Sequence, residues 1–267
     1  MSHIELFIKN KTMSILWIIF ILISIVQSQN DLTIANPNVT EVHCPSDGDC
    51  TIYCTKSSGC SYTTIYCNNN DPINNYQCNI LCYLSSNSSC SNLNVIALDT
   101  THVSIVCIGR YQCESLTAII ILHDTPNVTA QILCQGNYSC DSSSIIIDTN
   151  SETNLINNFD PSSGNIKRNI ELDCQSNYAC YNLHFMVSAI DYIKLFCHGY
   201  YSCESVDIIY GTIEPFPSGI LEIDCYGGEE ACGHMDIVAL TAKQLKIICG
   251  ESTESYNAEQ CKWMKVC

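Results

Sequence analysis

Apolar and polar residues alternate in short segments that each end at a cysteine, and these segments recur along most of the chain. An isoleucine or leucine stands two residues before each of these cysteines, an apolar residue stands four before, and the residue between them is polar. The cysteines are Cys54, Cys82, Cys107, Cys134, Cys174, Cys197, Cys225 and Cys249. Because successive side chains of a strand point to opposite sides, this alternation predicts a β-strand with one buried face.

A second alternating segment follows a second cysteine, which usually stands six residues after the first. The residue five positions after this second cysteine is apolar, and the residue four positions after it is polar. The polar residues are Thr64, Asn94, Thr117, Ser144, His184, Asp207, Asp236 and Lys265. The period is two rather than 3.6, so the pattern predicts strands and not helices.

The repeat predicts an all-β fold, a single-stranded parallel β-helix (β-solenoid) of about eight coils. A coil of roughly 25 residues buries no core alone, whereas equivalent strands stacked about 4.8 Å apart bury one continuous core. We expect a lead-in over residues 29–43 and the cysteine-rich repeat domain over 44–267. A longer spacing between Cys134 and Cys174 indicates a surface-loop insertion at about 148–169.

Two further rows bear on the stacking. The residues three before the anchor cysteine run Glu171, Lys194, Glu222, Lys246 in four successive coils, which favours in-register pairing of opposite charges.

The second row lies six residues after the second cysteine and is apolar, although alternation directs it outward. Either the strand bends there and buries the row, the interpretation we favour, or the row is an apolar stripe for a partner. The row is Tyr66, Ile96, Ile119, Ile146, Met186, Ile209 and Val238.

The first 28 residues are typical of a secretory signal peptide. Lys9 and Lys11 precede an apolar run from Met13 to Val26, and cleavage is expected near Ser28. A membrane anchor is the alternative, but the run is shorter than the roughly 20 residues that cross a bilayer. No later segment is apolar enough to span a membrane, so we expect a secreted, extracellular protein. Four glycosylation sequons fit that compartment: Asn38, Asn87, Asn127 and Asn137.

All 21 cysteines follow the leader, which favours disulfides in an oxidising compartment. Local closure of each turn would pair them as Cys44–Cys50, Cys54–Cys60, Cys67–Cys78, Cys82–Cys90, Cys107–Cys113, Cys134–Cys140, Cys174–Cys180, Cys197–Cys203, Cys225–Cys232 and Cys249–Cys261. Ladder pairing between neighbouring coils is the open alternative. Cys267 is left over, and two interpretations stay open: a disulfide to another chain, or a truncated sequence. The chain has no C-x2-C motif, so we expect neither a zinc site nor any cofactor.

The chain is acidic, with a formal net charge of −16, and loss of the leader makes it one unit more negative. A surface of this charge repels nucleic acid and anionic lipid. Arg110 and Arg168 are its only arginines. We therefore expect no nucleic-acid partner and no membrane span in the mature chain.

The stretch CPSDGDCTIYCTKSSGCSYTTIYC from Cys44 to Cys67 resembles the cysteine-rich repeats of uncharacterised secreted or surface proteins of protists. The later units CQGNYSC, CQSNYAC and CHGYYSC are similar to the same repeat. The resemblance implies a pectin-lyase-like right-handed β-helix and carries no established activity. The later coils depart from it by placing aliphatic residues where the first cysteine pair would stand, as at Val103, Ala130 and Ile170.

A tyrosine recurs two residues before the second cysteine in four consecutive coils, at Tyr111, Tyr138, Tyr178 and Tyr201. Such a row of rings could stack on sugars and makes these residues ligand-binding candidates. The alternative, which we favour, is that the rings cover the turn and support one another.

His184, Asp207 and Asp236 share one outward position on three consecutive coils. Carboxylates one rung apart could share a proton or a calcium ion, so these are the candidate catalytic residues, although a solvated acidic face is the interpretation we favour. No G-x-S-x-G, H-E-x-x-H or phosphate-binding glycine loop occurs. We expect a non-catalytic structural, adhesion or glycan-binding protein whose partners are extracellular glycans or surface proteins. The alternative is a carbohydrate-active hydrolase or lyase.

Overall fold

A computed structural model describes residues 30–34, 38–45, 48–55, 59–68, 76–83, 88–123, 127–149, 168–211, 218–228, 230–240, 242–250 and 265–266. The chain from Asp31 onward forms one compact unit. The expected signal peptide, most of the expected insertion, Cys261 and Cys267 lie outside the described residues.

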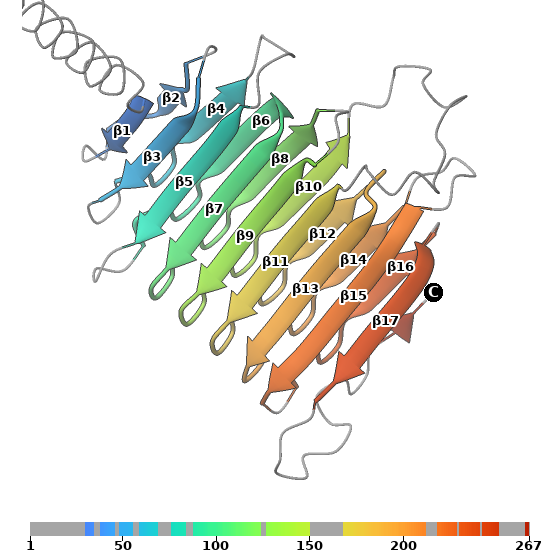
Figure 1. The fold of residues 1–267 in the computed structure, drawn as a ribbon. Coiled ribbons are helices and arrows are strands. Elements are labelled where there is room, and N and C mark those ends of the chain that lie inside the picture. Colours follow the sequence, from blue (N-terminus) through green and yellow to red (C-terminus); the bar gives the residue numbers. More distant parts are fainter. Residues whose placement is uncertain are drawn as a thin grey trace, which may run out of the picture. The chain divides into compact units, whose positions relative to one another are not determined.

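Strands of two sheets alternate along the chain (Figure 1). The first sheet contains β1 (Asn30–Ile34), β3 (Cys50–Cys54), β5 (Gln77–Tyr83), β7 (His102–Ile108), β9 (Thr129–Gln135), β11 (Asn169–Gln175), β13 (Tyr192–Gly199), β15 (Ser218–Gly227) and β17 (Ala242–Cys249). The second sheet contains β2 (Glu41–His43), β4 (Thr64–Asn68), β6 (Asn94–Thr100), β8 (Thr117–Leu122), β10 (Ser144–Thr149), β12 (His184–Val187), β14 (Asp207–Tyr210), β16 (Asp236–Ala239) and β18 (Lys265–Val266).

The fold is a parallel β-solenoid, as the repeat predicted. Each inner strand of a sheet pairs in parallel with the strand one coil before and one coil after it, as β11 does with β9 and β13. Each sheet has nine strands among the described residues, so the number of coils differs slightly from the expected eight. The additional strands are β1 and β2, which lie in the segment 29–43 that we expected to be a lead-in.

Equivalent residues of successive coils lie in register. Cys134 lies beside Cys174 in the sheet, although the connection between them is longer than in other coils. Cys174 in turn lies beside Cys197. The isoleucine or leucine two residues before the cysteine points inward, and Ile132 and Leu195 are fully buried. Inward residues of both sheets form one continuous hydrophobic cluster. The alternation in the sequence therefore sets both the strand positions and the register.

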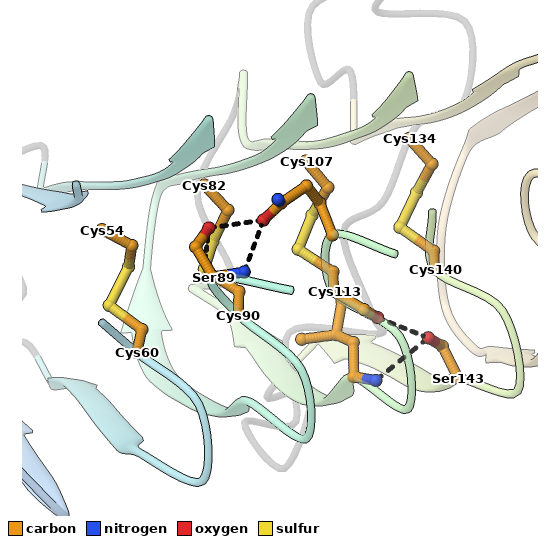
Figure 2. The surroundings of a disulfide bond; sticks show 12 residues. Cys54, Cys60, Cys82, Ser89, Cys90, Cys107, Cys113, Cys134, Cys140 and Ser143 are labelled. Carbon is orange, nitrogen blue, oxygen red and sulfur yellow. Dashed lines mark hydrogen bonds between the residues drawn. A yellow bond between two sulfur atoms is a disulfide. The ribbon is translucent and has the colours of Figure 1, made fainter. Parts of the chain in front are cut away.

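Each disulfide closes the turn between two strands that follow one another in the chain. The structure joins nine pairs: Cys44–Cys50, Cys54–Cys60, Cys67–Cys78, Cys82–Cys90, Cys107–Cys113, Cys134–Cys140, Cys174–Cys180, Cys197–Cys203 and Cys225–Cys232. Successive bonds repeat along the stack in Figure 2. Cys249 is also disulfide-bonded, and its expected partner lies outside the described residues. Cys78 pairs in register with Val103, so beyond the first coils an aliphatic side chain fills the place of a disulfide.

Buried polar side chains link the turns of neighbouring coils (Figure 2). The backbone N–H and the hydroxyl of Ser89 both donate to the side-chain oxygen of Gln112 in the next coil. Ser143 accepts from the backbone N–H of Leu116 at 3.1 Å and donates to the carbonyl of Cys113 at 3.2 Å. Because a buried polar group without a partner is costly, these bonds add specificity to the stacking of the turns.

Opposite charges meet on neighbouring rungs at the C-terminal coils, as the charge alternation predicted. The Glu222 carboxylate lies 3.6 Å from the Lys194 ammonium and 3.3 Å from that of Lys246. Burial raises the pKa of Glu222, but the hydrogen bonds from Lys246 and Tyr192 and the two ammonium charges outweigh it and hold the pKa below its ordinary value. This ion-pair group supports the register of β13, β15 and β17.

Replacement of Cys134 and Cys140 by alanine tests the contribution of one local disulfide. We expect the free energy of unfolding to fall by about 2 kcal/mol, because a seven-residue loop closed in the unfolded chain loses that much entropy. Denaturant unfolding without reductant measures the change, and Gln131→Ala, an exposed position on the same strand, is the control. Equal stability of the double variant and the control would show that the bond does not support the coil.

One turn carries a strained residue where other coils have glycine. Gly109, Gly136, Gly199 and Ser176 occupy the same turn position with φ values of 123°, 145°, 149° and 144°. A Cβ at Gly199 would lie 2.5 Å from the backbone carbonyl carbon of Ser176, so this region of the turn tolerates side chains poorly. We expect Ser176→Gly to raise stability by about 1 kcal/mol, since glycine adopts this conformation without strain.

The reverse substitution Gly199→Ser provides the matched comparison. We expect it to lower stability, because the added Cβ meets backbone atoms rather than the flexible end of a side chain. Thermal unfolding of both variants measures the pair of effects. A stabilised Gly199→Ser variant together with a destabilised Ser176→Gly variant would contradict the assignment of strain to this turn position.

Candidate functional site

A shallow polar hollow, called the polar groove below, lies at the start of β12, β14 and β16 of the second sheet and reaches the turn before β10. The hollow is open to solvent and measures about 530 Å³. Two rows of side chains line it, one from the turns and one from the first strand residues. The turn row is Ser142, Asn182, Ser205 and His234, and the strand row is His184, Asp207 and Asp236. The repeat therefore places two residues from each of three coils, and Ser142 from a fourth, on the same groove, at fixed offsets from the second cysteine of each coil.

The turns present the first row because their backbone is left-handed at that position. Ser142, Asn182, Ser205 and His234 have φ values of 54°, 52°, 58° and 54°. A left-handed residue reverses the chain direction within the turn, and asparagine and serine are common in turns because their short polar side chains bond nearby backbone groups. Histidine at the same position in the last of these coils departs from the pattern.

The three candidate catalytic residues come together in this groove. His184 pairs in register with Asp207, and Asp207 pairs with Asp236. The Nδ1 atom of His184 lies 2.9 Å from a carboxylate oxygen of Asp207, while the two side chains stay 69% and 48% exposed. Since water reaches both groups, the groove offers hydrogen bonds to a ligand but does not exclude solvent from a reaction.

A second group of titratable side chains borders the groove. Glu204, Glu230 and His234 place one ligand atom each within 4.8 Å of one another. Burial raises the pKa of Glu204, the negative charge of Glu230 raises it further, and His234 lowers it. Burial also raises the pKa of Asp141, against hydrogen bonds from Ser142 that lower it. The sequence did not single out these residues, since their shared place depends on turns in different coils.

Three triads of cysteine sulfurs also converge among the described residues, but they are not thiolate sites. They are Cys44, Cys67 and Cys78; Cys54, Cys60 and Cys90; and Cys82, Cys90 and Cys113. Every one of these cysteines is bonded in a disulfide. A disulfide sulfur has no thiolate charge to give a metal ion, so these clusters are parts of the core.

The four tyrosines form a continuous stack of rings. The ring centroids of Tyr111 and Tyr138 lie 5.1 Å apart, those of Tyr138 and Tyr178 4.8 Å, and those of Tyr178 and Tyr201 5.0 Å. The Arg110 guanidinium lies over the Tyr111 ring at 4.8 Å. Both faces of the inner rings are thus covered by neighbouring rings. A sugar that stacks on a ring face has no access to them, so the geometry favours mutual support of the turns.

The apolar row on the second sheet points outward. Ile119, Ile146, Met186 and Ile209 are each more than a third exposed. The expectation that the strands bend here and bury the row is wrong, because the alternation of the strands continues through these positions. The row forms an exposed stripe beside the polar groove.

Three of the four sequon asparagines lie in described residues and are exposed: Asn38, Asn127 and Asn137. Asn87 lies outside them. The exposed positions leave room for a glycan, which stays a prediction. Within the described residues, no helix has the length and apolar character that crossing a bilayer requires.

Comparisons of the chain with family models, with curated proteins and with solved structures gave no match. The many disulfides are typical of extracellular proteins.

Removal of the middle of the tyrosine stack tests its structural role. We expect Tyr138→Ala to lower the free energy of unfolding by about 1–3 kcal/mol, because two stacked contacts of roughly 0.5–1.5 kcal/mol each are lost. Tyr200→Ala, which removes an exposed ring from a turn two coils away, is the control. Denaturant unfolding compares the two variants, and a smaller loss for Tyr138→Ala than for Tyr200→Ala would refute a supporting role.

Proposed function

We propose that this chain is a secreted, non-catalytic adhesion protein that binds an extended neutral glycan in the polar groove. The observation that carries the proposal is the groove itself, in which hydroxyl, amide, imidazole and carboxylate groups of four successive coils face the same hollow. Three strand spacings of about 4.8 Å give the groove a reach of roughly 14 Å, which suits a chain of sugars better than a single one.

The charge of the groove selects the class of glycan. Asp207 and Asp236 accept hydrogen bonds from sugar hydroxyls, and such bonds to charged groups are stronger than neutral ones. The same carboxylates, on a chain with a net charge of −16, repel uronic acids and sulfated sugars. Neutral polysaccharides therefore fit the groove better than acidic ones.

The proposal includes export of the protein from the cell. Residues 1–28 act as a signal peptide cleaved near Ser28, and the mature chain is glycosylated at the exposed sequons. The density of disulfides supports this, because thiols in a reducing cytosol stay unpaired. N-terminal sequencing of the protein exported by a eukaryotic host tests the cleavage site. Relationship to the cysteine-rich repeat proteins of protists, and the right-handed β-helix it implies, is part of the same proposal.

Binding of neutral and acidic polysaccharides to the purified mature chain tests the proposed function. We expect binding to a neutral polysaccharide that falls about tenfold or more in the double variant Asp207→Asn, Asp236→Asn, since hydrogen bonds to charged groups contribute roughly 1.5–3 kcal/mol each. Thr117→Ala, at the same strand position three coils before Asp207, is the matched control. Binding to no polysaccharide, or equal losses in both variants, would overturn the proposal.

The second candidate is a carbohydrate-active hydrolase or lyase, favoured by the His184–Asp207 contact and the neighbouring Asp236 in one groove. We expect no release of reducing ends from any polysaccharide that the chain binds, because the exposed groups lack the preorganised, water-poor surroundings on which catalysis depends. A reducing-sugar assay checks this expectation. Release of reducing ends that is lost in Asp207→Asn and kept in Thr117→Ala would establish the enzyme instead.

A further inference from the structure

One coil departs from the repeat at two turn positions at once. Two residues before the second cysteine, where four earlier coils have a stacked tyrosine, this coil has Glu230. Two residues after that cysteine, where earlier coils have mostly serine or asparagine, it has His234. The coil also has one more residue between Cys225 and Cys232 than the usual spacing. Glu230 cannot continue the stack of tyrosine rings, so support of the turn does not explain this residue.

Glu230 and His234, the two departures from the repeat, both lie near the Glu204 carboxylate of the preceding coil. Glu204, Glu230 and His234 bring two carboxylate oxygens and one imidazole nitrogen within 4.8 Å of one another. Glu230 and His234 keep the left-handed backbone of the repeat, with φ values of 55° and 54°. The positions are therefore set by the turn conformation, while the side chains are particular to this coil.

The cluster contains two carboxylates, those of Glu204 and Glu230, and both side chains are partly buried. The ligand oxygens of Glu204 and Glu230 lie within 4.8 Å of one another, so their charges repel at close range. Asp207 and Asp236 of the adjoining groove add two further carboxylates. A divalent cation between Glu204 and Glu230 would remove the repulsion that the bare cluster contains.

We propose that Glu204, Glu230 and His234 bind a divalent transition-metal ion, with Zn²⁺ as the ion that fits the donors best. One imidazole nitrogen and two carboxylate oxygens are donors that zinc takes in tetrahedral sites that leave the fourth position to water. Calcium takes six to eight oxygen ligands and gains little from an imidazole. The site goes beyond glycan binding, since the metal is bound by the turns whether or not a sugar occupies the groove.

Calorimetric titration of Zn²⁺ into the full mature chain, after treatment with a chelator, tests the site without any glycan. We expect saturable binding of one ion per chain that weakens by at least about tenfold in His234→Ala and in Glu204→Gln, a loss that even removal of an outer-shell partner causes. His123→Ala is the matched control, because His123 also lies near a carboxylate, that of Asp99, but on distant coils. We expect the His123→Ala variant to bind Zn²⁺ with the affinity of the parent chain.

Circular dichroism and thermal unfolding verify that each variant folds, and Glu230→Gln, which keeps the shape of the side chain, gives a second test if His234→Ala does not fold. Zinc binding that is absent, or that is equally strong in the three site variants and the parent, would overturn the proposal. Calcium binding as tight as zinc binding would overturn it as well, since the imidazole would then contribute nothing. Loss of glycan binding in the groove variants, measured without metal, bears on the proposed function alone.

Discussion

Each coil of this chain is too thin to enclose its own apolar side chains, and everything else in the molecule depends on one coil covering the next. The inward residues of both sheets form a single cluster only because equivalent positions lie directly above one another. A shift of one residue in any strand would turn its buried row toward water. The register is therefore the constraint that the disulfides, the turn hydrogen bonds and the ion pairs serve. Ile132 and Leu172 illustrate it, since they meet across a long insertion and are both fully buried.

Stacking in register also creates the surfaces of the molecule. Any residue at a fixed offset in the repeat becomes one member of a row that runs along the solenoid. Tyrosines in one such row stack into a column, polar residues in two others line a groove, and aliphatic residues in a fourth form an exposed stripe. A change in one coil, such as Glu230 in place of tyrosine, then stands out as a local departure from a regular surface. In a repeat protein, such departures are the places where function is expected.

Much of the fold follows from the sequence because its signals are local and repeated. Alternation around Cys134 and Cys174 predicted the strands, their buried faces and their parallel pairing. The place of His184, Asp207 and Asp236 on one surface followed from the same offsets. The groove itself could not be predicted in this way. It depends on left-handed turns that place Ser205 and His234 beside the strand row, and residue spacing does not determine backbone conformation. The outward apolar row at Met186 was misjudged because its apolar character was given more weight than the strand alternation, which directed it outward.

In-register stacking can be measured directly in solution. Nuclear Overhauser effects of the isotope-labelled mature chain should connect the backbone of β9 with that of β11, placing Ile132 beside Leu172 and Cys134 beside Cys174 across the insertion. The account predicts these contacts together with slow amide exchange on both strands, because their N–H groups are paired within the sheet. Contacts that join shifted pairs, or that join β9 to a strand of its own coil in an antiparallel hairpin, would contradict the stacked solenoid and the groove that depends on it.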